Sequence, residues 1–305
     1  MGYIKSFLKS LWGTYLYYKF KRLYNKDPKL AADALYLKIN GRHINLDNPS
    51  SLIEKITWLS LNTDTSLWTL CADKYRMRNY VEAKGWGEYL PKCYGFWEEP
   101  NDIDFSKLPD RFVLKANNGC ATVIIVHDKN KQNEVKVKKQ MKRWLNRPFG
   151  YMGAQKHYLS IKPGVIAEEL LIQSKDYDKI SPNSIVDFKI WCFKGIPESI
   201  LVCYDRQPGN LKIALFDTEW KPISQHLNSS SKDTYHPEIT ITKPSHFNKM
   251  LEIASSLSKD FDEVRIDFYN TDEKAVLGEM TFTTGYGYFT DEYYKYLGDK
   301  IDIKK

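Results

Sequence analysis

The chain has 305 residues, of which 42% are apolar and 14% aromatic, so it is no disordered polypeptide and has enough apolar residues for one large core or two smaller ones. Its formal net charge is +7, but residues 1–26 carry six Lys or Arg side chains and no acid, which leaves the rest close to neutral. A protein that binds nucleic acid through phosphates needs a basic surface on its folded body. We therefore expect no nucleic-acid partner.

Cysteine and histidine are scattered along the chain. The five cysteines are an odd number without a CxxC pair, which excludes a disulfide framework and a zinc ribbon, and there is no HExxH motif. This usage predicts a reducing, cytoplasmic setting. Any metal ion would then be held by oxygen ligands.

Residues 3–23 have the apolar spacing of an amphipathic helix, carried by Ile4, Leu8, Leu11, Tyr15 and Tyr18. The apolar stretch between Lys9 and Lys19 is too short to span a bilayer. Two interpretations stay open for this basic, aromatic-rich segment. Residues 1–24 lie peripherally on the anionic inner face of a membrane, or the same apolar stripe packs on the body of the protein.

The remaining chain changes from helical to strand-rich patterns. Residues 27–110 read as a mainly helical leading domain, with helices at 50–63 and 73–84. A hairpin with strands at 112–115 and 122–127 follows, and then a basic helix at 131–146. Further strands are expected at 165–171, 185–193, 198–204, 211–216, 263–269 and 275–282, with a polar loop at 217–243 and a helix at 244–258. This clustering of strands predicts an α+β fold with largely antiparallel sheets.

Three of the predicted strands alternate apolar and polar residues. The polar positions are Asp187 and Lys189, Arg265 and Asp267, and Glu279 and Thr281. If the strands are neighbours, one sheet face collects these six side chains. Such a face is either open to water or arranged around a charged ligand, because burying charges without partners is costly. Asp267 and Glu279 have the carboxylate oxygens that Mg²⁺ prefers.

Phosphate-binding candidates lie before these strands. Lys115 ends an apolar strand and is followed by the turn Asn117-Asn118-Gly119, whose backbone N–H groups can face phosphate oxygens. Lys74, near a helix start, is a second candidate. The chain has no Walker A motif and no complete GxGxxG turn, which excludes the P-loop and Rossmann folds.

Taken in order, these blocks resemble the ATP-grasp superfamily and, within it, the TupA-like family linked to teichuronopeptide and other surface-polysaccharide loci. The matching blocks are Asp73–Tyr75, Phe112–Gly119, Ile166–Leu170, Asp187–Gly195, Val264–Tyr269 and Gly278–Phe282. The resemblance implies that a small lobe (111–170) and a large lobe (171–305) clamp ATP between them.

The resemblance also implies roles for single residues. The residues expected at the nucleotide are Lys74, Lys115, Asn118, Gly119, Glu168, Glu169, Leu170 and Asp187. Asp267 and Glu279 are expected to hold Mg²⁺, with Thr281 in a position where many ATP-grasp enzymes have asparagine. Lys189 and Arg265 are expected near the transferred phosphate, as the catalytic pair.

The implied reaction is an ATP-dependent ligation. A substrate carboxylate is phosphorylated to an acyl phosphate, and an amine then forms the amide. The implied carboxylate belongs to a small molecule or to a glycan. The implied product is a modified acidic component of a cell-surface polysaccharide or teichuronopeptide. Acceptor contacts are sought at 283–285. Two alternatives stay open: a glycosyltransferase that uses the acid pairs at 102/104, 176/178 or 260/262, and a non-catalytic membrane-associated binding protein.

Overall fold

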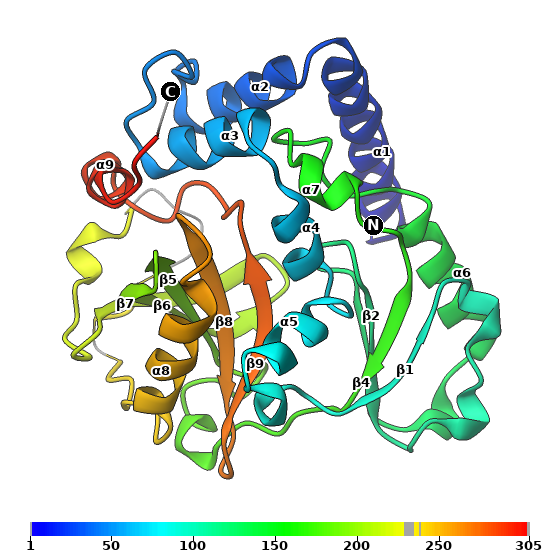
Figure 1. Cartoon of the computed structure of the whole chain (residues 1–305). Coiled ribbons are helices and arrows are strands. Elements are labelled where there is room, and N and C mark those ends of the chain that lie inside the picture. Colours follow the sequence, from blue (N-terminus) through cyan, green and yellow to red (C-terminus); the bar gives the residue numbers. More distant parts are fainter. Residues whose placement is uncertain (1, 229–234, 238, 304–305) are drawn as a thin grey trace.

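The computed structural model describes residues 2–228, 235–237 and 239–303, and of residues 2–12 it describes the backbone alone. Two antiparallel sheets lie side by side, and a group of helices from the first part of the chain covers one end of both (Figure 1). The α+β class with antiparallel sheets is confirmed.

The leading helices begin and end at recognisable capping signals. They are α1 (Gly2–Lys26), α2 (Pro28–Asn40), α3 (Leu52–Asn62), α4 (Ser66–Ala72) and α5 (Met77–Ala83). Asp27 accepts a hydrogen bond from the Lys29 N–H at the start of α2, and Ser51 and Glu54 form a reciprocal capping box at the start of α3. The helix predicted at 73–84 begins only at Met77, because the Asp73 side chain holds the preceding residues in a turn.

The small sheet has the strand order β1-β4-β2-β3. Its strands are β1 (Cys93–Trp97), β2 (Phe112–Ala116), β3 (Val123–Val126) and β4 (Val165–Glu168). One face packs on α6 (Glu134–Leu145), whose buried residues are Val137, Met141 and Leu145. Strand alternation turns Lys115 and Glu168 to the other face. Strand β1 was not predicted, and it lies before the expected lobe boundary at residue 110.

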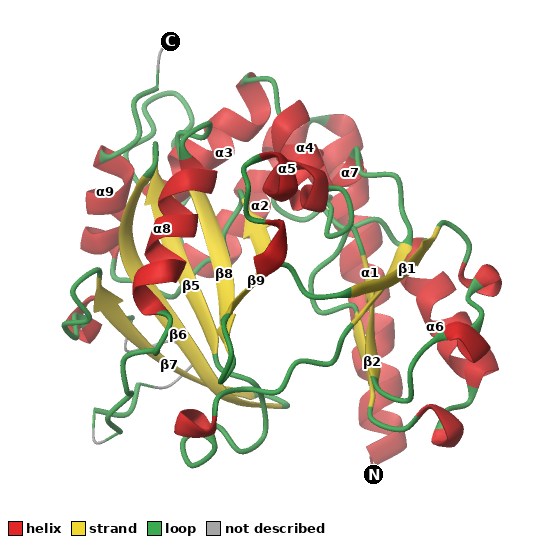
Figure 2. Cartoon of the chain, turned by 60° about the horizontal axis from the view of Figure 1, so that its bottom comes forward, coloured by secondary structure: helices red, strands yellow, loops and turns green. Residues whose placement is uncertain are grey.

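The large sheet has the order β7-β6-β5-β8-β9. Its strands are β5 (Asp187–Phe193), β6 (Ile196–Gln207), β7 (Asn210–Asp217), β8 (Val264–Asn270) and β9 (Ala275–Thr281). Helix α8 (Phe247–Ser258) packs along this sheet (Figure 2). The short helices α7 (Lys156–Leu159) and α9 (Asp291–Asp299) complete the fold, together with 3-10 turns at Gly87–Tyr89, Pro100–Asp102, Phe105–Lys107, Lys129–Lys131, Lys175–Tyr177 and Ser224–His226.

The leading helices share one hydrophobic core with the large lobe, whereas the small lobe has its own. Trp68 of α4 stacks on Phe282 at the end of β9, with 5.3 Å between ring centroids. The Tyr80 hydroxyl of α5 donates to the Leu257 carbonyl at 2.8 Å. The predicted domain boundaries at residues 26, 110 and 170 remain predictions.

The second half of α1 packs on the body of the protein. Phe20 is buried, and the rings of Tyr17 and Tyr24 meet Tyr151 edge-on at 5.8 and 5.4 Å. Ile4, Leu8 and Leu11 of the predicted apolar stripe lie outside the residues whose side chains are described. None of the helices in the described part of the chain is long and apolar enough to cross a membrane.

Candidate functional site

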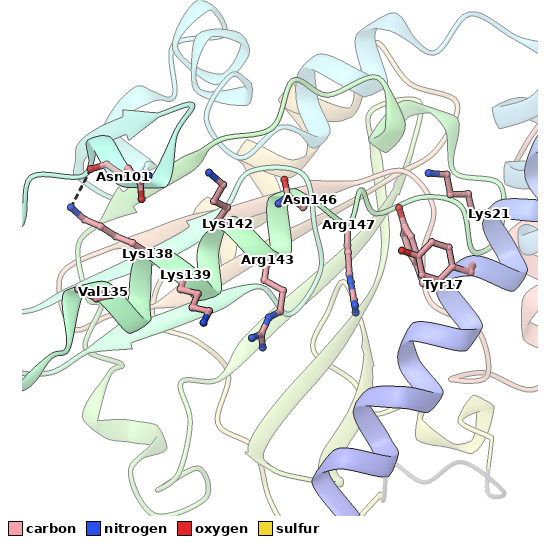
Figure 3. Close-up of a pocket in the computed structure, with 11 residues that line it drawn as sticks. Tyr17, Lys21, Asn101, Val135, Lys138, Lys139, Lys142, Arg143, Asn146 and Arg147 are labelled. Carbon is pink, nitrogen blue, oxygen red and sulfur yellow. Dashed lines mark hydrogen bonds between the residues drawn. The ribbon is translucent and has the colours of Figure 1, made fainter.

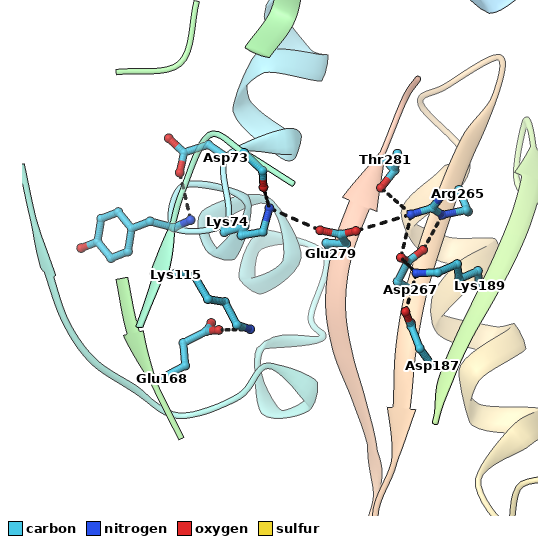
Figure 4. Close-up of polar contacts among 12 residues, drawn as sticks. Asp73, Lys74, Lys115, Glu168, Asp187, Lys189, Arg265, Asp267, Glu279 and Thr281 are labelled. Carbon is cyan, nitrogen blue, oxygen red and sulfur yellow. Dashed lines mark hydrogen bonds and ion pairs between the residues drawn. The ribbon is translucent and has the colours of Figure 1, made fainter. Parts of the chain in front are cut away.

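Three neighbouring strands bring the predicted charged residues onto one face of the large sheet (Figure 4). In the strand register, Lys189 of β5 lies opposite Asp267 of β8, and Asp267 lies opposite Glu279 of β9. Arg265 and Thr281 are partners in the next row. The expectation that these strands are neighbours is therefore confirmed.

Hydrogen bonds join these side chains into one network. Arg265 donates from Nε and Nη2 to the two oxygens of Asp267, at 2.7 and 2.8 Å, and from Nη2 to the Thr281 hydroxyl at 3.1 Å. Lys189 Nζ pairs with Asp267 and lies 2.5 Å from Asp187 Oδ2. The bidentate contact between Arg265 and Asp267 fixes the guanidinium plane. With Glu279, which lies 3.4 Å from Arg265 Nη2, the network contains two cations and three carboxylates.

Burial makes the electrostatics of this network strong. Lys189, Arg265 and Asp267 are buried, whereas a third of the Glu279 side chain is exposed. Burial disfavours the charge on Lys189, but Asp187 and Asp267 outweigh it and raise the Lys189 pKa well above its ordinary value. Burial also opposes ionisation of Glu279, but Lys74, Lys189 and Arg265 prevail and lower its pKa. Lys189 and Glu279 are therefore both charged at neutral pH.

Lys74 connects this network to the small lobe. Its Nζ lies 3.3 Å from Glu279 Oε2 and donates to the Gly119 carbonyl at 2.8 Å, in the turn between β2 and β3. Its neighbour Asp73 is buried and accepts from Arg76 at 2.5 Å and from the Asn117 amide at 3.0 Å. The turn, Lys74 and the end of β9 are thereby held together.

A second ion pair lies on the small lobe. Lys115 Nζ is 2.6 Å from Glu168 Oε2, and Arg78 Nη1 is 3.6 Å from Glu168 Oε1. Asn118, in the adjoining turn, is buried, and its amide nitrogen has no hydrogen-bond partner among the residues that the structure describes. An unpartnered buried donor next to Lys115 is suited to an anionic ligand.

The segment that leaves β4 leads from the small lobe to the large one. The Glu169 carboxylate accepts from the Lys92 backbone N–H at 2.7 Å, so it does not share the face of Glu168 and Lys115. Leu170 is half-buried and lines a cavity of about 350 Å³, together with Gln173, Thr271 and Lys274.

Three residues have side-chain roles in the site that the sequence analysis did not assign. Asp73, Arg78 and Asn117 orient Lys74, Glu168 and the turn through the contacts above. The signals in the sequence were that Asp73 stands beside Lys74 and that Asn117 belongs to the predicted phosphate-binding turn.

The family model of the TupA-like ATP-grasp proteins matches residues 54–302. The chain belongs to the TupA-like ATP-grasp family. The resemblance stated from the sequence is therefore confirmed, and with it the expected ATP-grasp fold.

Solved structures with a similar fold include three ligases. They are the D-alanine–D-alanine ligase of Bacillus anthracis complexed with ATP (15% identity, 76% of this chain and 65% of that chain, TM-score 0.46), the L-amino acid ligase of Bacillus licheniformis (15%, 77% and 49%, TM-score 0.45), and the ATP-grasp ligase PsnB with a precursor variant, Mg and ADP (10%, 82% and 64%, TM-score 0.42). This TupA-like chain spans less than two thirds of the length of each. No curated protein sequence matches it.

The donor set of this TupA-like site fits a magnesium ion. Among the described residues, no group of three or more His, Cys, Asp or Glu side chains forms a complete metal site. Asp267 and Glu279 offer paired carboxylates in adjacent strands, and Asp187 has a buried oxygen without a partner. Mg²⁺ is commonly held by one or two carboxylates and completed by phosphate oxygens and water. Thr281 already accepts from Arg265, so its place as a metal ligand stays a prediction.

The acid pairs proposed for a glycosyltransferase lie in local structure. Asp104 accepts from the Ser106 N–H at 3.0 Å and begins a 3-10 turn, and Asp176 lies within another turn. Asp260 binds the Tyr80 hydroxyl and Lys84, at 2.9 and 2.7 Å. None of these three acid pairs lies on the charged face of the large sheet.

Proposed function

We propose that this TupA-like ATP-grasp protein is an ATP-dependent, Mg²⁺-requiring carboxylate–amine ligase. The observation that carries the proposal is the row Lys189, Asp267 and Glu279, which continues through Lys74 to the turn of the small lobe. Phosphoryl transfer needs positioned cations and acids more than a nucleophilic side chain, and this site has both.

Each charged side chain has a role in this reaction. Asp267 and Glu279 would hold Mg²⁺, which would neutralise phosphate charge when bound. Lys115 and Lys74 bind phosphate oxygens, as the family resemblance implies, with Asn118 and Gly119 above them and Glu168 to Leu170 at the adenosine. Arg265 binds the transferred phosphoryl group, because its guanidinium stays protonated and binds two oxygens at once.

The observed ion pairs are the resting partners of these groups. Lys74 neutralises Glu279, and Lys115 neutralises Glu168. With Glu279 engaged by a metal ion, Lys74 would no longer be needed as its partner, and the Lys74 ammonium group would be available to phosphate. A buried charge left without a partner is costly, so the exchange requires that each group gain a new partner of opposite charge.

The proposed carboxylate belongs to an acidic component of a cell-surface polysaccharide or teichuronopeptide, which rests on the family membership. Thr283 and Thr284 follow β9 with buried hydroxyls that have no partner, and this supports acceptor contacts there. All five cysteines are free, which supports a cytoplasmic setting.

The test is nucleotide-dependent stabilisation followed by turnover. Mg-ATP at a hundred times its dissociation constant should stabilise the folded chain by about 2.7 kcal/mol. Asp267→Asn and Glu279→Gln should remove Mg-dependent ADP release with panels of carboxylates and amines, while circular dichroism stays unchanged. Asp102→Asn with Asp104→Asn is the matched control and should keep full turnover.

Two results would contradict the proposal. Near-normal turnover in both metal-strand variants would remove the metal assignment. Stabilisation by a UDP-sugar but not by Mg-ATP, lost in the Asp102/Asp104 variant, would identify a glycosyltransferase instead.

A further inference from the structure

A groove of about 680 Å³ lies between α1 and α6, and we call it the basic groove (Figure 3). Six cations line it: Lys21, Lys138, Lys139, Lys142, Arg143 and Arg147. Lys21 comes from α1, and the other five come from α6 and the residues just after it. Two segments far apart in the sequence therefore bring their charges to one place.

Within the described part of the chain, no acidic side chain neutralises these cations. Among the side chains that the structure describes, no carboxylate lies within 4 Å of any of the six. Lys138 donates to the Asn101 carbonyl at 3.2 Å, Arg143 to Gln140 at 3.4 Å, and Lys21 lies 5.5 Å from the centre of the Tyr151 ring. Like charges held together raise the local potential, and an anion that enters the groove lowers it.

The rest of the molecule has the opposite charge. Residues 1–26 carry six cations and no acid, and residues 131–147 carry seven cations with Glu134 as the single acid. The net charge of these two segments together is larger than the +7 of the whole chain, so the remaining residues carry a net negative charge. The sequence-based expectation that the folded body has no basic surface is thus incomplete, because α6 belongs to the body and concentrates its cations beside α1.

The basic groove lies away from the proposed nucleotide site. Helix α6 covers the apolar face of the small sheet, and Lys115 and Glu168 point from the opposite face. A ligand in the basic groove would therefore leave the phosphate-binding residues accessible.

Aromatic residues accompany the cations. Tyr17 and Tyr18 line the basic groove, and the Tyr18 side chain is 60% exposed. Toward the start of α1 the sequence has Trp12 and Leu11, then Lys9, and then Leu8 and Phe7 followed by Lys5. Cations with tyrosine and tryptophan are typical of helices at a membrane interface, whereas a soluble polyanion needs the cations alone.

We propose that the basic groove and α1 form a docking face for an anionic phospholipid membrane, with headgroup phosphates bound by the α6 cations. This proposal is independent of the ligase activity. It extends the peripheral contact expected for residues 1–24 to a site on the folded body.

The experiment is cosedimentation of the full chain with vesicles. Vesicles of phosphatidylcholine with phosphatidylglycerol should bind the chain, those of phosphatidylcholine alone should not, and binding should weaken as salt rises. The variant Lys139→Ala/Lys142→Ala/Arg143→Ala/Arg147→Ala removes four exposed cations and should weaken binding at least about tenfold. Tyr18→Ser should weaken it severalfold without changing the salt dependence.

The matched control removes equal charge from exposed positions of the large lobe. Lys175→Ala/Lys179→Ala/Lys221→Ala/Lys295→Ala should keep vesicle binding within about twofold. Circular dichroism and stabilisation by Mg-ATP verify that both variants fold.

Three outcomes would overturn the proposal. Equal losses in the two quadruple variants would show a nonspecific effect of net charge. Equal binding to neutral vesicles would exclude headgroup recognition. Tighter binding to single-stranded nucleic acid or to an acidic polysaccharide, lost in the α6 variant, would assign the groove to a soluble polyanion.

Discussion

At the scale of single residues, His157 of α7 is a fully buried imidazole with neither ring nitrogen hydrogen-bonded. Its ring centroid lies 5.7 Å from that of Trp68 and 4.4 Å from that of Tyr158. Burial, helped by the charge of Lys156, disfavours the imidazolium and lowers the His157 pKa to about 3. The imidazole is therefore neutral in the folded protein at physiological pH.

We predict that His157 weakens the fold in acid. The unfolded chain binds the proton below about pH 6.5 and the folded chain only near pH 3, so the free energy of unfolding falls as pH drops through that range. His157→Phe removes this dependence. The free energy of unfolding of the variant minus that of wild type should be about 2 kcal/mol larger at pH 5 than at pH 7.5, measured by urea denaturation. An identical difference at both pH values would contradict the assigned shift.

The residue scale also shows what the sequence could predict about the site. Strand alternation is local, so the sequence alone assigns Lys189, Asp267 and Glu279 to the polar side of their strands, but it grouped them only on the condition that the strands are neighbours. The contact between Asp73 and Asn117 could not be predicted, because these residues are 44 positions apart and no periodic pattern relates them.

At the scale of elements, α9 packs against the start of α3 through a glycine. A Cβ on Gly298 would overlap the Ser50 carbonyl oxygen and lie 2.7 Å from the Ser51 carbonyl carbon, next to the capping box of α3. Both neighbours are backbone atoms, so no side chain can move aside.

We predict that Gly298→Ala separates the two helices and costs about 1–3 kcal/mol of unfolding free energy. Gly13→Ala is the control, because Gly13 lies in α1 with no atom within 4 Å of an added Cβ. It should be neutral or stabilise by about 0.5–1 kcal/mol, since alanine is the better helix former. Thermal and urea denaturation of both variants would measure this, and a stable Gly298→Ala protein would refute the close approach.

Elements with strong periodicity could be predicted, and those without it could not. The strands of the large sheet alternate clearly, whereas all five residues of β1 are half-buried and include Gly95, so no alternation marks them. Helix α9 was also missed, because its apolar face consists mostly of tyrosines and ends in Gly298.

At the scale of the whole molecule, the two cores have unequal sizes. The leading helices and the large lobe share the larger one, whereas the small lobe depends on a compact cluster beneath α6. Opening of the small lobe therefore breaks fewer apolar contacts than opening of the large lobe.

We predict that amide hydrogen exchange is faster in β2, β4 and α6 than in β5 and β8. Mg-ATP should slow exchange in the small lobe, because a ligand held by both lobes must leave before that lobe opens. Exchange mass spectrometry with wild type and Asp267→Asn would measure this, the variant showing no slowing. Uniform exchange across both lobes would contradict the two-core description.

The whole-molecule charge distribution could not be predicted from totals along the chain. An average over residues 27–305 is nearly neutral because the cations of α6 are balanced by acids elsewhere, and only the fold shows that the two groups are separated in space.

Cations gathered on one side of the molecule, with no acid among the residues that line the basic groove, create a positive pole there and with it a dipole moment. Far from any contact, a charged surface exerts a torque on such a molecule and turns it before the two meet. The protein would approach an anionic surface with the α1–α6 side facing that surface. Encounters would therefore begin mostly in this one orientation. Raising the ionic strength shortens the reach of that torque and should slow association more than it speeds dissociation.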